Sequence, residues 1–546
     1  MKGHSLSYLI KNKIFQLLIF ISLPLISFFF SLYQLNLQYD GFHHGVMFVT
    51  IQDLLKEKVP YKEFLPHYGL IFIYLSSIFV KIFSNSIFGL YFLVSLCKGI
   101  TILLFGIIIK KKFNQKIAIS TMLIVFLLMP FVDTPWPEYL FLTFVLISIY
   151  LLIIDQNKYS LFISGFFFSI AGLTKDNFII VLFLTIISYS FFLVYLKIYK
   201  KKKIENNFLN FFWILGYTLP LLFFIVYLSN NHLVANYLDH FKIGSIAIRN
   251  YCTSNVDIFV LRSFDCGLIS LQNLINLSYS KIFTEPYWFF FLLIIITNIY
   301  FISNVSFFDK QMIIKKEKNL MIFISLLSII LFSNTLYFLT IQRLYTGVLI
   351  GIIVVIYLIQ TLKSPIYKYS IYVLISVFLL NGFQLARTPN HPIYPTYTKK
   401  YKNTYENLKF LKYKKLSKNE WQQLNDFEIL TTKTKKRCPF INYSTNLTND
   451  VFFRVILEKN FEILNFIPFG PRDKYIADMY KFFDKSYFRN LNQEIKRQNI
   501  IIAIDDTLKM KNNLKNNIDL YLLRNIKYNN YGTKFVSIFL PKKCKF

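Results

Sequence analysis

Long apolar runs separated by short polar segments fill the first 385 residues of the chain. A helix needs about 20 mostly apolar residues to cross the hydrocarbon core of a bilayer. Eleven stretches approach or exceed that length, and they predict an α-helical polytopic membrane protein with about 11 transmembrane helices. The predicted spans are residues 14–36, 86–109, 117–132, 138–154, 160–174, 177–197, 209–229, 286–306, 319–340, 345–362 and 369–385.

Residues 68–83 are apolar but short, and they decide the sidedness of everything that follows. Lys and Arg collect in short cytoplasmic loops. If this stretch crosses the membrane, the basic clusters at residues 110–112, 200–203 and 315–318 all fall outside. If it lies at the membrane surface, all three fall inside. The rule therefore favours a juxtamembrane segment, together with a cytoplasmic N-terminus before the first span.

The hydrophobic pattern changes after residue 385, where the apolar runs shorten to between four and eight residues. Runs of that length are typical of strands. Residues 499–504 and 534–540 are predicted strands, and residues 406–416 and 473–489 are predicted helices.

Two domains follow from this change of pattern. Residues 1–385 form a transmembrane domain, within which residues 37–85 make the first outer loop with its juxtamembrane helices. Residues 386–546 form a C-terminal extracytoplasmic α/β domain, large enough to build its own core.

Composition supports the membrane assignment and argues against nucleic acid as a partner. Hydrophobic residues make up 55% of the 546 residues and charged residues only 16%, whereas a soluble protein carries about 25% charged residues. The net charge of +32 would indicate nucleic-acid binding in a soluble protein. Here the lysine clusters are topology signals and contacts to anionic lipid, so no nucleic-acid partner is predicted. The bilayer itself is the predicted partner.

Four of the five cysteines fall on the predicted outer side of the membrane. Two disulfides are open to them, one joining Cys252 to Cys266 and one joining Cys438 to Cys544, but four free thiols are an equal alternative. Outer cysteines suit an oxidising compartment such as a periplasm. We therefore expect a bacterial inner-membrane protein with a periplasmic C-terminal domain.

The first outer loop holds the most informative chemistry. Asp40 follows the first span, and His43 and His44 stand at the start of an amphipathic pattern that continues with Phe48 and Ile51. A carboxylate beside two imidazoles at the membrane surface suits a site that removes a proton. The alternative is a capping Asp at a helix N-terminus with two interfacial histidines.

Two short motifs carry a resemblance to a known family. The first loop continues with Pro-Tyr-Lys-Glu-Phe at residues 60–64, and Gly-Leu-Thr-Lys-Asp occupies residues 172–176. With the first span and Asp40, these resemble the polytopic membrane glycosyltransferases of the GT-C fold, such as the protein mannosyltransferases and the enzymes that move an aminosugar onto lipid A. The resemblance covers residues 1–200 well and the later spans only in architecture.

The resemblance implies transfer of a hexosyl or pentosyl unit from a polyprenyl-phosphate or dolichyl-phosphate donor on the outer face, with inversion. The acceptor would be a glycan, lipid or protein. Asp40 inherits the role of base, and Lys175 and Arg343 would bind the donor phosphate, where negative charge develops. For both cations the alternative is snorkelling to the interface. Gly41 stands where many relatives have a second acid, so no cofactor is predicted, although a divalent metal stays open.

Further polar residues on the same side are candidates for binding substrate. The acids beside Trp136 lie in a Pro-rich turn, and the alternative for them is simple solvation between two helices. The candidate substrate-binding residues are His43, His44, Glu63, His67, Asp133, Trp136, Glu138 and Asp176.

Two other membrane functions compete with the glycosyltransferase. A transporter or flippase for polyprenyl-linked glycans usually keeps polar groups at mid-bilayer and shows repeated halves, and neither is evident in the sequence. An O-antigen polymerase or ligase is also polytopic, but it would have a large outer loop rich in arginine, which this chain lacks.

Overall fold

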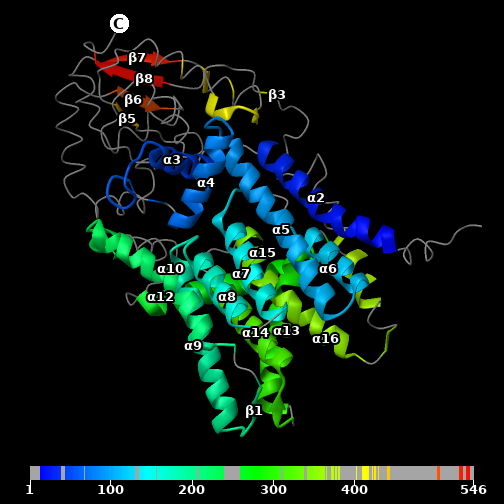
Figure 1. Cartoon of the computed structure of the whole chain (residues 1–546). Coiled ribbons are helices and arrows are strands. Elements are labelled where there is room, and N and C mark those ends of the chain that lie inside the picture. Colours follow the sequence, from blue (N-terminus) through cyan, green and yellow to red (C-terminus); the bar gives the residue numbers. More distant parts are fainter. Residues whose placement is uncertain are drawn as a thin grey trace, which may run out of the picture.

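The computed structural model shows a bundle of helices with a small β-sheet at one end (Figure 1). Most of the transmembrane domain is described, and the C-terminal region only in short stretches. The described residues are 13–37, 43–64, 66, 68–129, 134–154, 157–205, 208–238, 259–283, 285–308, 311–336, 341–362 and separate stretches between 364 and 541.

Eight helical stretches among these residues are long and apolar enough to cross a membrane. They confirm an integral membrane protein of the predicted helical class. They are α2 (Lys13–Leu37), α5 (Phe88–Lys112), α7 (Pro137–Ile154), α9 (Asn177–Ile198), α10 (Phe211–Asn230), α13 (Tyr287–Ser303) with the π-helix Asn304–Phe308, α14 (Lys316–Thr335), and α15 (Ile341–Val348) joined by the 3-10 turn Leu349–Gly351 to α16 (Ile352–Thr361).

The remaining predicted spans differ from these eight. Within the predicted spans 117–132 and 160–174 the described helices are short: α6 (Gln115–Leu127) has 13 residues and α8 (Lys158–Gly172) has 15. At 1.5 Å per residue such helices reach about 20 Å, less than the hydrocarbon core. Nine of residues 369–385 are described, and all nine are helical, but they belong to three short stretches between 370 and 380, so the count of eleven stays a prediction. Residues 68–83, expected at the membrane surface, contain the short helix α4 (Leu70–Ile82).

Asparagine side chains fix where three of these helices begin. Asn114, Asn157 and Asn210 each accept a hydrogen bond from a backbone N–H three residues later, at 3.0, 2.8 and 3.1 Å. Such caps satisfy backbone donors that a helix leaves unpaired at its start. They therefore fix the residues at which α6, α8 and α10 begin, each after a polar loop.

Close helix packing depends on glycine at one crossing. A Cβ at Gly165 of α8 would overlap the carbonyl oxygen of Trp213, and a Cβ at Gly216 of α10 would overlap the carbonyl oxygen of Phe162. The two backbones can approach this closely only because neither residue has a side chain. This crossing holds the short helix α8 against the span α10.

The three basic clusters meet at one end of the bundle, which we call the basic end. The Lys112 ammonium lies 2.9 Å from the Glu317 carboxylate. The parallel strands β1 (Lys203–Ile204) and β2 (Ile313–Ile314) pair there, at the bottom of Figure 1. Both interpretations of residues 68–83 place all three clusters on one side of the membrane, and the structure brings them together at one end.

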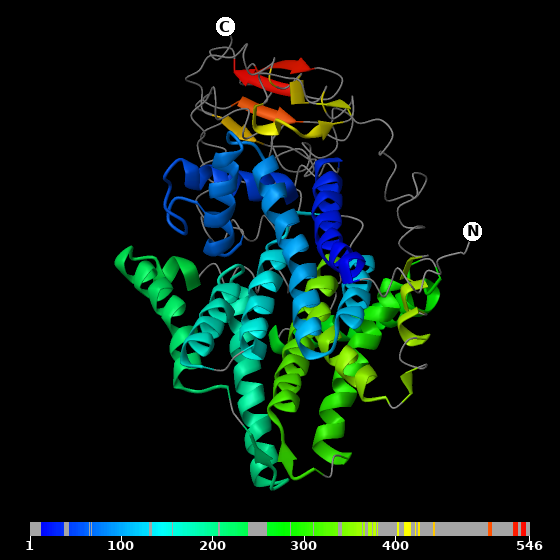
Figure 2. The same ribbon diagram turned by 45° about the vertical axis from the view of Figure 1, so that its right-hand side comes forward.

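The opposite end carries a four-stranded sheet, and we call it the sheet end (Figure 2). Helices α3 (His43–Leu55) and α4 lie on this side. The sheet order is β5-β6-β8-β7; β5 pairs with β6 in parallel and the other pairs are antiparallel. Its strands are β5 (Phe440–Asn442), β6 (Ile501–Ile504), β7 (Tyr528–Gly532) and β8 (Ser537–Pro541).

Strands β6 and β8 fall where strands were predicted, whereas the helix predicted at 406–416 is wrong over its described part. Residues Lys409–Leu411 form one 3-10 turn and Lys415–Leu416 form β4, paired with β3 (Tyr401–Lys402). Tyr413 has a φ of 72°, which no α-helix accommodates. The predicted helix at 473–489 lies outside the described residues, so the α/β domain as a whole stays a prediction.

Candidate functional site

Three segments far apart in the sequence meet on the sheet side of the bundle. They are the start of α7, the turn between α8 and α9, and the start of α15, which contribute Glu138, Lys175 and Arg343 respectively. We call these three residues the ion cluster. Helix α9 runs from this cluster to the basic end, and α14 runs back, so that Asn177 and Asn334 hydrogen bond at 3.3 Å beside the cluster. The cluster and the basic clusters therefore lie at opposite ends of the same helices.

One buried carboxylate joins the two predicted phosphate-binding cations. The Lys175 Nζ donates to Glu138 Oε1 at 2.7 Å, and the Arg343 Nε lies 3.9 Å from the same oxygen. The Glu138 side chain is 3% exposed, whereas Lys175 and Arg343 are 16% and 22% exposed. The second oxygen, Oε2, has no hydrogen-bond partner among the described residues. The cluster thus presents two cations outward over an anion beneath them.

Aromatic rings surround the cations. The Arg343 guanidinium lies 5.6 Å from the centre of the Trp136 ring, and the Lys175 ammonium lies 5.4 Å from that of Phe178. The Tyr68 ring meets Trp136 edge-on, with 6.0 Å between centroids. Rings over cations add attraction that strengthens where water is excluded. Trp136 is buried between Arg343 and Tyr68 rather than presented as an open stacking face for a sugar.

Helix α4 fixes the turn that carries Lys175. The Gly69 N–H donates to the Thr174 carbonyl at 3.1 Å, and the Ile71 N–H donates to the Leu173 carbonyl at 3.3 Å. A Cβ at Gly69 would overlap the Leu173 carbonyl oxygen and crowd the Lys175 nitrogen. The end of the first outer loop is therefore fitted directly against the Lys175 turn.

Burial changes the titration of Lys175. Desolvation lowers the pKa of its ammonium, the neighbouring Arg343 lowers it further, and the Glu138 carboxylate opposes both. The net pKa lies below the ordinary value for lysine. The energy of keeping this cation charged thus depends on Glu138.

Asp176, the next residue, joins a different network. Its two carboxylate oxygens lie 3.3 and 3.5 Å from the Tyr61 hydroxyl, which donates to them. The Asn236 Nδ2 donates to the Tyr61 carbonyl at 2.9 Å. Burial, reinforced by Asp176, raises the pKa of Tyr61 well above its ordinary value, and the same causes raise that of Tyr237. Asp176 therefore ties the first outer loop to the loop after α10.

Two other candidates have local partners. His44 is fully buried in α3, and its Nδ1 lies 2.8 Å from the Tyr91 hydroxyl. The Glu63 carboxylate accepts a hydrogen bond from the Val59 N–H at 2.6 Å within its own turn. Neither contact tests substrate binding, so both assignments stay predictions.

Several predicted residues lie outside the described part of the chain. These include the proposed base and some candidate acids and histidines, so their assignments also stay predictions. They are Asp40, His67, Asp133 and the cysteines 252, 438 and 544, together with the side chains of His43 and Cys266.

Among the described residues, no three His, Cys, Asp or Glu side chains are grouped in a way that would hold a metal ion. Asp40 and Asp133 lie outside the described residues, so the question of a divalent metal stays as the sequence left it.

Two buried lysines were not predicted. Lys98 lies within α5, 1% exposed, with its ammonium 4.2 Å from the centre of the Tyr139 ring. Lys414 is fully buried beside α2. A lone lysine in an apolar span was the available signal for Lys98, whereas Lys414 stands in a lysine-rich stretch where no single residue is distinctive.

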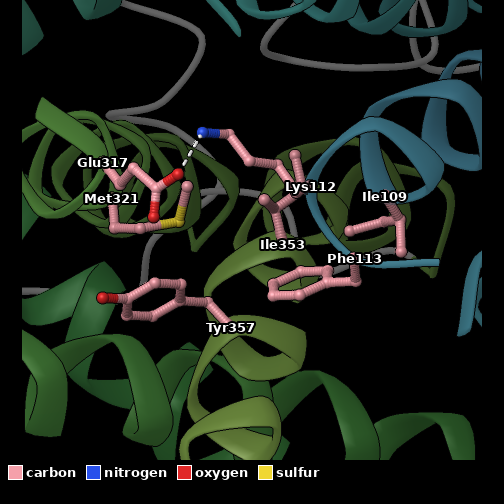
Figure 3. Close-up of a pocket in the computed structure, with 7 residues that line it drawn as sticks. All are labelled: Ile109, Lys112, Phe113, Glu317, Met321, Ile353 and Tyr357. Atoms are coloured by element: carbon pink, nitrogen blue, oxygen red, sulfur yellow. Dashed lines mark hydrogen bonds and ion pairs between the residues drawn. The ribbon is translucent and has the colours of Figure 1, made fainter.

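A small cavity lies at the basic end, far along the helices from the ion cluster. Its volume is about 20 Å³, and its lining includes Lys112 and Glu317, whose ion pair is drawn in Figure 3. That volume holds about one water molecule. The cavity is therefore too small for a sugar or a lipid phosphate.

Part of the chain matches a known protein family. Residues 67–229 match the profile of the dolichyl-phosphate-mannose-protein mannosyltransferase family. The matched region contains α4, the start of α7 and the Lys175 turn, whereas Arg343 lies beyond it. No curated protein matches the chain by sequence. Over residues 67–229 the match confirms the resemblance to GT-C membrane glycosyltransferases.

Two solved structures align over most of this chain. ArnT from Cupriavidus metallidurans bound to undecaprenyl phosphate aligns over 96% of this chain and 98% of its own, with 10% identity and a TM-score of 0.49. An oligosaccharyltransferase from Archaeoglobus fulgidus in complex with Zn and sulfate aligns over 97% of this chain and 72% of its own, with 11% identity and a TM-score of 0.47.

Proposed function

We propose that this chain is an integral membrane glycosyltransferase that takes a sugar from a polyprenyl-phosphate-linked donor and passes it to a glycan, lipid or protein acceptor at the sheet end. The family match over residues 67–229 supports the reaction class and a lipid-phosphate donor. The observation that carries the proposal is the ion cluster, in which two partly exposed cations share one buried carboxylate.

The distribution of charge supports an orientation. The three basic clusters share the basic end, and basic clusters of this kind face the cytoplasm. The ion cluster and the sheet then face the periplasm of a bacterial inner membrane, with the N-terminus in the cytoplasm. This arrangement brings a carrier phosphate at the outer leaflet to the same level as Lys175 and Arg343.

Sugar transfer from a lipid phosphate requires two kinds of group. A base takes the proton of the acceptor hydroxyl while that oxygen attacks the anomeric carbon, and the bond from that carbon to the phosphate oxygen breaks. The phosphate leaves with the bonding electrons. Asp40 is the proposed base, and Lys175 and Arg343 stabilise the charge that develops on the phosphate. Attack opposite the leaving phosphate inverts the anomeric centre.

Glu138 has a defined part in this scheme. Without it, two cations beside apolar rings would repel each other and lose solvation. With it, the cluster keeps a net charge of +1, which favours binding of an anionic phosphate. A larger positive charge would bind the leaving carrier phosphate too tightly for release. The Arg343 Nε lies 3.9 Å from the carboxylate, against 2.7 Å for Lys175. Arg343 is also the more exposed of the two cations, at 22% against 16% for Lys175.

The test uses purified protein in liposomes with labelled polyprenyl-phosphate sugars and candidate acceptors. Removing one group that stabilises developing charge costs about 10²-fold or more in turnover, so Arg343→Gln should lose at least that, and Asp40→Asn should lose transfer altogether. Lys112→Gln is the matched control, since it removes a cation from the basic end. Wild-type transfer by Asp40→Asn would refute the base, and wild-type transfer by Arg343→Gln would refute the phosphate site.

A flippase for polyprenyl-linked glycans is the second candidate, and one observation favours it. Lys98 is a buried cation inside a membrane span, the kind of residue that transporters keep on a substrate path. The same liposomes decide between the two. Movement of a labelled carrier across the bilayer without acceptor, and with no sugar transferred, would replace the glycosyltransferase with the flippase.

A further inference from the structure

Residues 409–416 dock into the sheet end of the transmembrane bundle, and we call them the docking segment. Phe410, Leu411, Lys414 and Leu416 in this segment are all at most 5% exposed. The segment follows the last predicted span, yet it packs against the first 91 residues of the chain. The contact therefore links the C-terminal region to the first outer loop.

Lys414 caps the C-terminal end of α2. Its ammonium donates to the carbonyl oxygens of Leu35 at 2.9 Å and Asn36 at 3.3 Å, in the last turn of α2. These carbonyls have no partner within the helix, and a cation is favourable at that end of the helix dipole. The neighbouring Lys415 N–H donates to the Asn36 side chain at 3.2 Å.

The same segment also holds α3 and α5. The Phe410 ring stacks on Phe48 of α3, with 5.9 Å between centroids. The Lys414 ammonium lies 4.7 Å above the centre of the Tyr91 ring, and the Tyr91 hydroxyl lies 2.8 Å from His44 Nδ1. One buried cation therefore connects the end of α2 to the start of α3 through a tyrosine and a histidine.

The start of α5 is fixed by the backbone of the docking segment. The Ile87 N–H donates to the Phe410 carbonyl at 2.9 Å, and the Ser86 hydroxyl donates to the Lys412 carbonyl at 2.7 Å. These contacts place α2, α3 and α5 around one short segment. Their relative arrangement depends on residues that lie beyond the transmembrane domain.

Five residues, 38–42, connect α2 to α3, and Asp40 is the middle one. Both ends of this connection are held by the docking segment. We propose that Lys414 is a positioning residue for sugar transfer, and that the C-terminal region sets the geometry of the first outer loop through it. The inference rests on the proposed function, because the loop contains the proposed base. Lys414 is fully buried, so it does not contact the substrate.

The first measurement is transfer kinetics of Lys414→Met, which keeps the length of the side chain and removes its charge. Misplacing a reacting group by about 1 Å costs about 10²-fold in rate, so kcat should fall by at least tenfold, with KM for the donor changed by less than twofold. Lys412→Met is the matched control, because the Lys412 side chain is exposed and its ammonium lies 5.0 Å from the centre of the Tyr413 ring. A wild-type kcat in Lys414→Met, or an equal loss in Lys412→Met, would overturn the proposal.

The second measurement is hydrogen exchange and needs no substrate. Peptides from residues 35–48 should exchange faster in Lys414→Met than in the wild type, while peptides from α4 should not change. Unchanged exchange in 35–48 would overturn the proposal even if activity falls. If the wild type transfers no sugar from any donor, the proposed function fails, and exchange still decides whether Lys414 holds the loop. Should Lys414→Met not fold, Asn36→Ala tests whether the docking segment holds the end of α2, because it removes the Lys415 N–H contact. Peptides from residues 35–48 should again exchange faster than in the wild type, and unchanged exchange would overturn the proposal.

Discussion

The pair formed by Glu138 and Lys175 gives the sharpest test of the ion cluster. At an effective dielectric constant of about 20, charges at 2.7 and 3.9 Å attract by about 6 and 4 kcal/mol before desolvation is subtracted. Breaking a buried pair by removing one partner costs about 3 to 5 kcal/mol in unfolding free energy. Lys175 and Arg343 keep some contact with water, so we expect the low end of that range.

A double-mutant cycle isolates the interaction. Glu138→Gln and Lys175→Gln should each lower the free energy of unfolding by about 3 kcal/mol. The first leaves both cations without their shared carboxylate, and the second leaves the buried Glu138 with the more distant Arg343. The double variant removes both charges and should lose about 3 kcal/mol in total, which gives a coupling of about 3 kcal/mol. Unfolding by denaturant in mixed micelles, followed by tryptophan fluorescence, measures all four proteins.

The matched cycle uses the ion pair at the basic end. Lys112 and Glu317 also lie within 2.9 Å, but the Glu317 side chain is 61% exposed. An exposed pair couples by less than about 1 kcal/mol. Additivity for independent sites holds to about 0.5 kcal/mol. If the two coupling energies agree within that limit, burial of Glu138 does not strengthen its pairing with Lys175, and the prediction is refuted.

Three further predictions follow from described contacts. Gly69→Ala should lower both the melting temperature and the transfer rate, because its Cβ would displace the Lys175 turn; thermal unfolding and transfer assays on the same preparation measure this. Gly165→Ala should destabilise by about 1–3 kcal/mol through overpacking while leaving KM unchanged. The raised pKa of Tyr61 means that its folded state keeps a proton that the unfolded state releases above pH about 10. Stability should therefore fall above that pH in the wild type and fall less in Tyr61→Phe, as melting curves from pH 8 to 11 would show.

Hydrophobic run length predicted the membrane-spanning helices well, because in a bilayer each span satisfies its backbone within one segment. It predicted α6 and α8 as spans too, although they stop at 13 and 15 residues. Asparagine caps at Asn114 and Asn157 set where these two helices begin. Run length alone does not contain that information.

The cations of the ion cluster were predicted singly, and their connection was not. Lys175 and Arg343 are 168 positions apart, so only the folded bundle brings them to the same carboxylate. Glu138 was assigned to substrate hydroxyls because its turn is rich in proline and tryptophan. The structure shows it as the counter-ion of both cations, and its contact with a substrate stays a prediction. A pairing of this kind depends on tertiary contacts that local patterns do not encode.

Lys175 and Asp176 are consecutive residues that belong to different networks, one in the ion cluster and one among the outer loops. A single peptide unit joins them, so a backbone shift at Lys175 would also move the Asp176 carboxylate that accepts from Tyr61. Carrier binding at the proposed phosphate site should thus change the positions of the loops around residues 57–63 and 231–238. A fluorescent label on either loop would then report carrier binding in real time, without any sugar being transferred.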